Sequence, residues 1–386
     1  MKRKSNSADS ILVVELGHHY FVIDEVLAIF EVGENVEVVV LVSDVNRFSK
    51  MYMNQQRFKT RIFEMKPLAS IAVAKLFLHL LFCQQKFSKI YYTTGPEHSR
   101  FIVVLLWAIT TLRVKKRIVL NVRNVGAYWK VEPNNIGYRC SGLVRRYVAR
   151  KVRYFTFETE AMRQAVVRIA ARNDLQSEVM SVRSSDSPIR CYSERSDSVS
   201  QDGGKLLLGV LGQIDELRKD YALLAGALKM MPRSLADRIN LEFLTSQEVS
   251  FLPEGLIAGE EVAMSLRANG YSESEMWRRA ADCAVLVSPL NAAVGYGALK
   301  GSGTFGDAIA LNKLLILPDW ADPLKEFASF CRYYSNIDDL VEILSSIATS
   351  PDIARLSSSV FDEYTKQALR VRFNAVHQVS EPPERR

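Results

Sequence analysis

Residues 284–317 read AVLVSPLNAAVGYGALKGSGTFGDAIALNKLLIL, and this stretch decides the fold of the second half of the chain. Its ends, residues 284–287 and 314–317, are short apolar runs of the kind that form buried parallel strands. Residues 304–311 between them have the composition of a helix, so the stretch predicts a strand–loop–helix–strand unit. The connecting loop holds five glycines within the twelve residues from Gly295 to Gly306.

The same alternation of strand and helix patterns extends along the chain. Apolar runs predict strands at residues 11–16, 36–42, 89–92, 117–122, 154–157, 206–211, 239–244, 284–287 and 314–317. Helices are expected at residues 20–30, 68–83, 101–112, 141–151, 220–231, 272–281, 304–311, 337–348 and 351–378. Strands that alternate with helices indicate an α/β fold whose open parallel sheets are covered on both faces.

A change of composition divides the chain into two predicted domains. Residues 181–200 contain eight serines and few apolar residues, and Gly203-Gly204 follow, which is typical of a flexible connection over about 181–204. We therefore expect a Rossmann-like first domain at residues 1–200 and a Rossmann-like second domain at 205–386. The last helix could pack back on the first domain.

Composition indicates a chain of the cytoplasm. The five cysteines are scattered and contain no CxxC pair, so they predict neither a disulfide framework nor a zinc site. The longest apolar stretches, at residues 68–83 and 101–112, are shorter than the roughly 20 residues that span a bilayer. No DxD motif lies in a suitable loop, so a metal is not expected.

The two halves differ in charge, which suggests different partners. Residues 1–200 carry 31 Lys and Arg against 18 Asp and Glu, whereas the remainder carries 19 against 25. A basic first half suits an acceptor that bears phosphate, or an anionic membrane surface. A solvated basic face is the alternative reading. Nucleic acid is not an expected partner, because no recognition module is present.

Ligands of open α/β sheets bind beyond the carboxyl ends of the strands, so the residues that follow strands are the informative ones. After the strand at 206–211 come Gly212 and Gln213, then Arg218 and Lys219, with a helix expected from Asp220. Glycine lets backbone approach a ligand, and a cation at a helix N-terminus suits phosphate. A turn with solvated charges is the alternative.

The glycine-rich loop is the second candidate. Its backbone N–H groups could cradle a pyrophosphate, with charge added by Lys300. The expected contacts come from the following run: Lys300, Gly301, Ser302, Gly303 and Thr304. Asp307 lies one turn into the helix and could accept hydrogen bonds from sugar hydroxyls. A flexible surface loop is the alternative. GxxxxGK[ST] is absent, and no GxGxxG follows the first strand, which argues against a nicotinamide enzyme.

The first half offers candidates for a general base. His18 and His19 follow its first strand, and Glu97 and His98 follow the strand at 89–92. A reaction that takes a proton from a hydroxyl nucleophile would need such a base. A histidine at such a position is as often structural as functional.

Several of these segments resemble motifs of glycosyltransferase family 4 (glycosyl transferases group 1). Residues 208–213 (LGVLGQ) resemble the strand and glycine turn that open the family's donor domain, and residues 303–318 are similar to its nucleotide-ribose motif. Residues 157–163 also resemble the end of its acceptor domain. The resemblance implies the GT-B fold, in which two Rossmann-like doubly wound domains face each other across a cleft.

The resemblance also implies roles for particular residues. Arg218 and Lys219 would lie on the donor diphosphate, and Asp307 stands where the family has its second glutamate. Two positions depart from the pattern. Leu299 replaces the first glutamate, which helps to hold the donor sugar, and Gln213 replaces an arginine.

The implied activity is that of a hexosyltransferase (EC 2.4) that uses a UDP- or GDP-sugar as its substrate and needs neither cofactor nor metal. Its acceptor would be a glycan, a glycolipid or a lipid-linked molecule in bacterial surface polysaccharide synthesis, and the chain would be peripheral at the inner face of the plasma membrane. The family favours retention of the anomeric configuration. Two alternatives stay open: an inactive GT-B-fold partner protein and a nucleotide-sugar epimerase.

Overall fold

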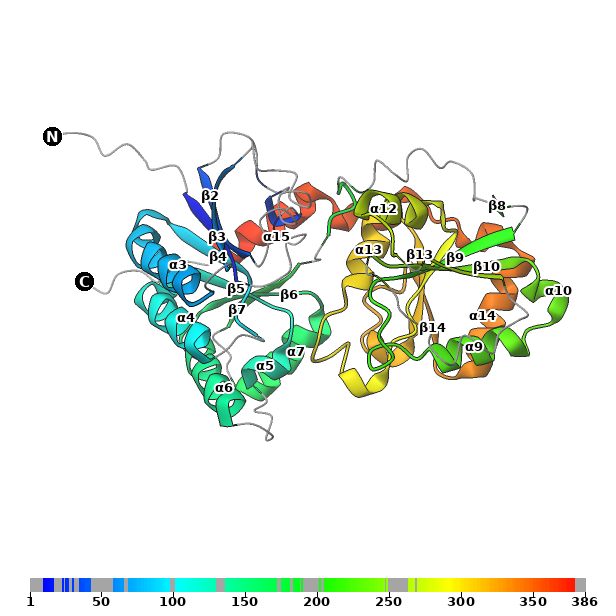
Figure 1. Cartoon of the computed structure of the whole chain (residues 1–386), viewed down its shortest axis with the longest axis horizontal. Helices are drawn as coiled ribbons and strands as arrows, with labels where there is room; N and C mark the ends of the chain where they lie inside the picture. The colour runs from blue at the N-terminus through cyan, green and yellow to red at the C-terminus, as the bar shows by residue number, and fades with distance from the viewer. Residues whose placement is uncertain are drawn as a thin grey trace. The chain divides into compact units, whose positions relative to one another are not determined.

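The computed structural model describes residues 10–16, 23, 25–27, 30, 35–42, 58–65, 69–97, 101–129, 136–171, 175–180, 183–187, 189, 201–202, 205–246, 248, 263–267 and 269–378. Contacts between residues divide the chain into two compact units (Figure 1). The first unit comprises residues 1–182, 299–301 and 366–386, and the second comprises residues 183–298 and 302–365. The division at 182/183 lies about twenty residues before the one that the sequence predicts.

The first unit is built on a seven-stranded sheet in the order β3-β2-β1-β4-β5-β6-β7. All neighbouring strands run parallel. Their bounds are β1 Ile11–Glu15, β2 Val36–Val42, β3 Lys59–Glu64, β4 Lys89–Thr94, β5 Ile118–Val122, β6 Tyr154–Phe157 and β7 Gln176–Val179. Strand order reverses between β1 and β4, so a ligand is expected at the carboxyl edge near these two strands.

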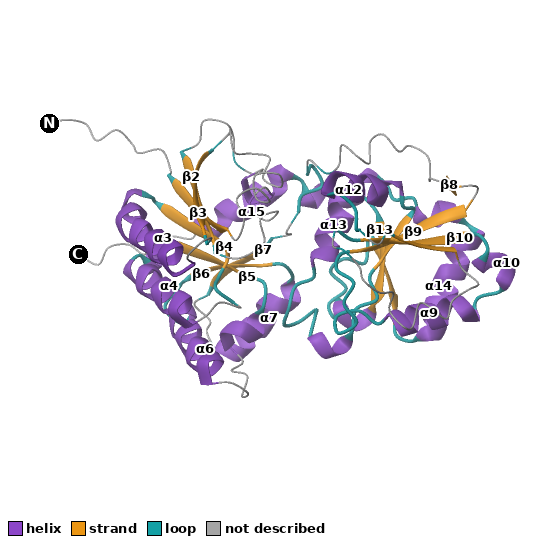
Figure 2. Cartoon of the chain, in the orientation of Figure 1, coloured by secondary structure: helices purple, strands orange, loops and turns teal. Residues whose placement is uncertain are grey.

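Helices cover both faces of this sheet (Figure 2). The described helices are α3 Ala69–Cys83, α4 Phe101–Arg113, α5 Val125–Trp129, α6 Ile136–Ala149, α7 Glu160–Ala170 and α15 Lys366–Gln378. Leu12 and Val14 of β1 face the core under α3, α4 and α6, whereas Ile11 and Val13 face the core that holds Phe373 of α15. Strands buried on both faces explain why the sequence shows unbroken apolar runs.

The second unit has a sheet in the order β11-β10-β9-β12-β13-β14, with β8 antiparallel to β9. Its strands are β8 Gln201–Asp202, β9 Lys205–Leu211, β10 Ile239–Leu244, β11 Ala263–Leu266, β12 Val285–Val287, β13 Leu314–Pro318 and β14 Cys331–Tyr334. Its α-helices are α9 Tyr221–Met230, α10 Arg233–Ala236, α12 Glu273–Asp282, α13 Gly303–Leu311 and α14 Ile337–Thr349. The glycine-rich loop thus connects β12 to α13, as the sequence predicts.

Besides the two-residue β8, four strands were not expected from the sequence: β3, β7, β11 and β14. Each is at the edge of its sheet. An edge strand has fewer neighbours to bury its side chains, so it does not need an apolar run. The sequences KTRIFE in β3 and QSEV in β7 accordingly carry charged or polar residues.

One predicted helix is wrong. Residues 351–378 are not one helix, because 3₁₀ turns at Pro351–Ala354 and Ser358–Tyr364 precede α15. Ser357 is the N-cap residue of the second turn, and its Oγ accepts a hydrogen bond from the backbone N–H of Ser359 (3.4 Å), so a separate turn begins there. The predicted linker at about 181–204 lies mostly outside the described residues and stays a prediction. Its described start at residues 183–187 is largely buried, and the N–H of Ser185 donates to the carbonyl of Tyr364 (2.9 Å).

A buried carboxylate in the second sheet gives a stability prediction. Glu242 of β10 accepts two hydrogen bonds from Arg279 of α12 (3.0 and 2.7 Å) and one from the hydroxyl of Tyr271 (2.5 Å). Arg279→Met leaves a buried charge without its cation, so we expect a loss of about 3 kcal/mol of unfolding free energy. Arg278→Met is the matched control, since Arg278 makes an exposed pair with Asp282 (3.3 Å) that contributes less than about 1 kcal/mol. Equal urea midpoints for the two variants would contradict the prediction.

Candidate functional site

The glycine turn lies at the carboxyl end of β9, in the second unit. Gly212 has φ +96°, a conformation that favours glycine, and its N–H donates to the carbonyl of Leu244 at the end of β10 (2.9 Å). Gln213 follows with an exposed side chain. The turn therefore places two residues with little side-chain cover at the sheet edge where ligands bind.

Lys219 is the buried cation of this turn. Its Nζ donates to the carbonyl of Leu211 (2.7 Å), and a Cβ on Gly212 would lie 3.7 Å from that Nζ. Burial lowers the pKa of Lys219 to about 8, while the charges of Asp307 and Asp215 act in the opposite direction. The ammonium group is thus charged at neutral pH, poorly solvated and next to the glycine.

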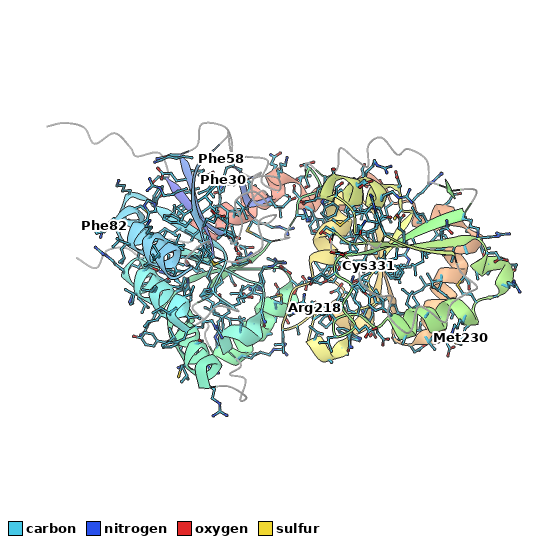
Figure 3. All side chains as sticks on the ribbon, viewed as in Figure 1. Phe30, Phe58, Phe82, Arg218, Met230 and Cys331 are labelled. Atoms are coloured by element: carbon cyan, nitrogen blue, oxygen red, sulfur yellow. The ribbon has the colours of Figure 1, made fainter. Side chains whose placement is uncertain are left out.

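Arg218 differs from its neighbour. Its side chain is 50% exposed and pairs with Asp215 (Nε to Oδ2, 3.1 Å), and Figure 3 labels it. An exposed pair of this kind contributes little binding energy and is screened by salt. Of the two cations that the sequence singles out, Lys219 is the one whose charge a bound anion would feel most strongly.

Three hydroxyl groups gather at the N-terminus of α13. Ser302 is the N-cap residue, and its Oγ accepts from the N–H of Thr304 (3.4 Å). The Oγ1 of Thr304 lies 3.0 Å from the Oγ of Ser302 and 3.2 Å from the Oγ of Ser288 at the end of β12. Gly303 is the first helical residue, and outside its own helical turn no atom of the described residues lies within 4 Å of where its Cβ would be. Such a helix end favours a negatively charged ligand.

Asp307 has a partner that sequence reasoning missed. Its Oδ1 accepts a hydrogen bond from Nε of Arg183 (2.9 Å), and the Arg183 guanidinium stacks on the ring of Trp277 at 4.7 Å. Both side chains are largely buried, at 18% and 6% exposure. Arg183 lies in the serine-rich stretch whose composition predicts a linker. A basic residue within that stretch is the sequence signal that could have revealed the pair with Asp307. The predicted contact of Asp307 with sugar hydroxyls stays a prediction.

Lys300 and Gly301 belong to the first unit rather than to the second. The N–H of Val125 donates to the carbonyl of Leu299 (2.7 Å), and the N–H of Gly301 donates to the carbonyl of Arg123 (2.9 Å). Leu299 packs against the core under α3 and α4. The position where the resembled family has a glutamate is thus occupied here by an apolar residue that packs in the core. Lys300 beside it forms an antiparallel β-bridge with Asn124.

A carboxylate of the first unit faces this anchor. Glu158 follows β6, is buried, and accepts a hydrogen bond from Nε of Arg123 (2.5 Å). Its Oε2 has no hydrogen-bond partner among the described residues and would lie 1.5 Å from a Cβ on Gly301. Only glycine fits at position 301 while Glu158 holds this place.

Gly301→Ala should therefore reduce the unfolding free energy by about 1–3 kcal/mol, because the added methyl group displaces a buried carboxylate. Gly303→Ala is the matched control two residues away, and the open space there predicts no loss and a gain of up to about 1 kcal/mol. A Glu158→Ala change in the Gly301→Ala background should recover part of the loss in a double-mutant cycle of urea unfolding. If Gly301→Ala and Gly303→Ala are equally stable, the contact is not present in solution.

Glu97 is the described candidate for a general base. It follows β4, is buried, and accepts hydrogen bonds from the N–H groups of Arg123 (3.0 Å) and Asn124 (3.2 Å). Burial raises the pKa of Glu97 to about 7, while these two hydrogen bonds and the Arg123 charge lower it. Its carboxyl group is poised between its two protonation states near neutral pH. His18, His19 and His98 lie outside the described residues.

Glu15 is a further buried carboxylate at this edge, and it is not among the residues that the sequence predicts for the site. It ends β1 and accepts hydrogen bonds from the hydroxyls of Thr93 and Thr94 at the end of β4. Three acidic residues thus lie at the carboxyl ends of strands β1, β4 and β6 of the first sheet: Glu15, Glu97 and Glu158. The sequence signal that could have revealed this carboxylate is the single acidic residue in the otherwise apolar run at residues 11–16. Among the residues that the structure describes, no cluster of His, Cys, Asp and Glu could hold a metal ion.

Comparisons with known proteins identify the fold. No protein-family model matches the chain, and no curated protein matches it. Among solved structures, the HepE protein of Anabaena, in complex with UDP and glucose, superposes with a TM-score of 0.59 at 13% identity over 95% of this chain and 96% of that one. WaaG, a glycosyltransferase involved in lipopolysaccharide biosynthesis, gives 0.57 at 13% identity over 95% and 94%.

A third similar structure is an epimerase. UDP-GlcNAc 2-epimerase from Neisseria meningitidis, bound to UDP-GlcNAc, gives a TM-score of 0.56 at 10% identity over 95% of this chain and 99% of that one. These similarities confirm the predicted GT-B architecture of two doubly wound α/β domains. The fold is common to glycosyltransferases and UDP-GlcNAc 2-epimerases, and membership of glycosyltransferase family 4 stays a prediction.

Proposed function

We propose that the chain is a glycosyltransferase that takes a sugar from a nucleoside-diphosphate sugar, UDP- or GDP-linked. The observation that carries this proposal is the buried Lys219 ammonium beside the glycine turn of Gly212. A diphosphate leaving group gains negative charge as the glycosidic bond breaks, and a desolvated cation stabilises that charge more strongly than a solvated one does.

The N-terminus of α13 would supply the second part of the diphosphate site. The hydroxyls of Ser302 and Thr304 can reorient to donate to phosphate oxygens, and the helix end contributes partial positive charge. With Lys219, these groups would provide positive charge without a bound metal. The positions of Gln213 and Arg218, with their exposed side chains, suit contacts to the outer part of a nucleotide.

The first unit would bind the acceptor, a glycan, glycolipid or lipid-linked molecule of bacterial surface polysaccharide synthesis at the inner face of the plasma membrane. If transfer inverts the anomeric centre, Glu97 would take the proton of the acceptor hydroxyl as the bond to the sugar forms. Its position after β4 and its pKa of about 7 support this role. A retaining reaction would not use it in this way.

A nucleotide-sugar epimerase is the second candidate. It is favoured by the buried carboxylates of Glu15, Glu97 and Glu158, because epimerisation needs groups that remove and return protons. An epimerase acts without any acceptor, so the two candidates predict different products. A third candidate is an inactive partner protein. It is supported by Leu299 and Gln213, which depart from the pattern of the resembled family.

One assay separates these candidates. The chain is incubated with UDP-glucose, UDP-GlcNAc or GDP-mannose, with and without a lipid-linked glycan acceptor, in buffer made with D₂O. A transferase releases nucleoside diphosphate faster when acceptor is present, and an epimerase produces a deuterated epimer without acceptor. Binding of a nucleotide sugar with neither product would indicate the inactive partner. No binding of any nucleotide sugar would reject all three.

A further inference from the structure

The outer surface of α3, α4 and α6 is unusually apolar for a surface that no described residue covers. Of the fifteen large apolar side chains that are exposed in the described part of the chain, nine lie on these three helices. Phe82 of α3 is 72% exposed (Figure 3). Six of the nine are more than half exposed: Leu78, Phe82, Ile102, Ile109, Leu143 and Tyr147. We call the outer surface of these helices the helical face.

These side chains follow helical spacing. Ile71, Leu78 and Phe82 repeat at intervals of seven and four residues on the outer side of α3. Ile102 and Ile109 lie seven residues apart on α4 with Leu105 between them, so each helix presents an apolar stripe outward as well as one inward. α4 packs against both α3 and α6 (Figure 1), so the apolar stripes of these helices are neighbours. A patch of this kind marks a binding surface.

Positive charge borders the stripes, and negative charge is missing from these helices. Residues 69–157 contain 16 Lys and Arg but only two acidic residues, Glu97 and Glu132, and neither lies on α3, α4 or α6. Exposed cations follow the C-terminal ends of α4 and α6: Arg113, Lys115, Lys116, Arg150 and Lys151. The border is therefore a basic band at one end of two adjacent apolar stripes.

We propose that the helical face binds the surface of an anionic phospholipid bilayer, with the apolar side chains inserted at the level of the headgroups and the basic band paired with lipid phosphates. This combination of apolar stripes and cations is what interfacial membrane binding requires. A second copy of this chain is a poor occupant, because it would bring two basic bands together without acidic residues on these helices to pair with them. The binding is peripheral, since no helix that the structure describes is long and apolar enough to cross a membrane.

The helical face lies away from the candidate site of the first unit. Helices α3 and α4 each lead into the following strand, so their C-terminal ends lie at the amino edge of the sheet, whereas Glu15, Glu97 and Glu158 lie at the carboxyl edge. Membrane binding would leave that edge accessible. Membrane binding rests on the proposed function in one respect, namely that a membrane-bound chain would reach a lipid-linked acceptor. Vesicle binding itself can be measured without any turnover.

The test uses the full chain and vesicles of phosphatidylcholine, either alone or mixed equally with phosphatidylglycerol. We expect co-sedimentation with the anionic vesicles only, weakened by salt. The double variant Phe82→Ser, Ile109→Ser should reduce the affinity for anionic vesicles by roughly tenfold or more, because both side chains leave water on insertion. Lys115→Gln with Lys116→Gln should reduce it about 30-fold. Met230→Ser and Val371→Ser, which change exposed apolar residues elsewhere, are matched controls and should retain wild-type affinity.

Cys140 provides a direct reporter of insertion. It is exposed on α6, and Cys83, Cys283 and Cys331 are buried, so after Cys191→Ser a polarity-sensitive dye would label Cys140 selectively. Its emission should shift to the blue on anionic vesicles, whereas the dye on a Met230→Cys variant that also lacks Cys140 should not shift. The proposal is overturned if the serine variants bind vesicles like the wild type. It is also overturned if they convert a dimer to a monomer without affecting vesicle binding. If the wild-type chain binds no nucleotide sugar, the proposed function is refuted, but the vesicle test still decides whether the helical face binds a membrane.

Discussion

Replacement of Lys219 by methionine is expected to lower the affinity for UDP by about 30- to 100-fold and the turnover number by about 100-fold or more. The ammonium group is desolvated, lies at the glycine turn and would contact the diphosphate directly. Methionine keeps the apolar stem and removes the charge, so the fold should survive. Titration calorimetry with UDP and measurement of UDP release give the two numbers.

Lys219 also predicts a pH dependence of binding. Because burial lowers its pKa to about 8, the free protein carries this charge below pH 8 and loses it above. The affinity for UDP should therefore fall as the pH rises through about 8 in the wild type, and this fall should be absent in Lys219→Met. Arg218→Met is the matched control on the neighbouring residue, whose exposed charge already pairs with Asp215, and it should lose less than about threefold. Equal losses for the two variants would refute the assignment of Lys219.

Glu97→Gln is the second change with a large expected effect. If Glu97 is the general base, kcat should fall by about 10²- to 10⁴-fold, and the ionisation near pH 7 should disappear from the profile of kcat/KM. Glutamine keeps an oxygen that can accept from the N–H groups of Arg123 and Asn124, so the local backbone should be preserved. An active variant with an unchanged profile would show that Glu97 only orders the backbone.

The same change should affect stability with a definite sign. The pKa of Glu97 is raised from 4.5 in the unfolded chain to about 7 in the folded protein. The contribution of this group is therefore fully present below pH 4.5 and is lost as the pH rises through about 7. Urea unfolding should show the wild type losing stability relative to Glu97→Gln over that interval.

The sequence was most informative where burial dictates composition. Strands that are covered on both faces, such as Val36–Val42 and Ile239–Leu244, need unbroken apolar runs, and their predicted bounds are confirmed. The edge strands β3 and β14 lack that requirement and were missed. A helix was predicted across Ser357, because apolar periodicity does not reveal a serine that bonds to its local backbone.

The sequence predicts the turns of the candidate site better than it predicts the contacts between side chains from distant parts of the chain. A strand followed by glycine and a cation correctly located Gly212 and Lys219 at the sheet edge, but burial, which distinguishes Lys219 from Arg218, depends on the whole fold. The pairing of Asp307 with Arg183 joins residues 124 positions apart, and no local pattern encodes it. The assignment of Lys300 and Gly301 to the first unit likewise depends on long-range contacts with Arg123 and Val125.

The central claim is that the second unit binds the diphosphate of a nucleotide sugar through the glycine turn and the N-terminus of α13. Hydrogen exchange of the full chain, with and without saturating UDP or GDP, tests this claim most directly. We predict slower exchange of the backbone N–H groups of residues 212–220 and 302–305 with at least one of the two nucleotides, and loss of this protection in Lys219→Met. Unchanged exchange in both segments with both nucleotides would contradict the account.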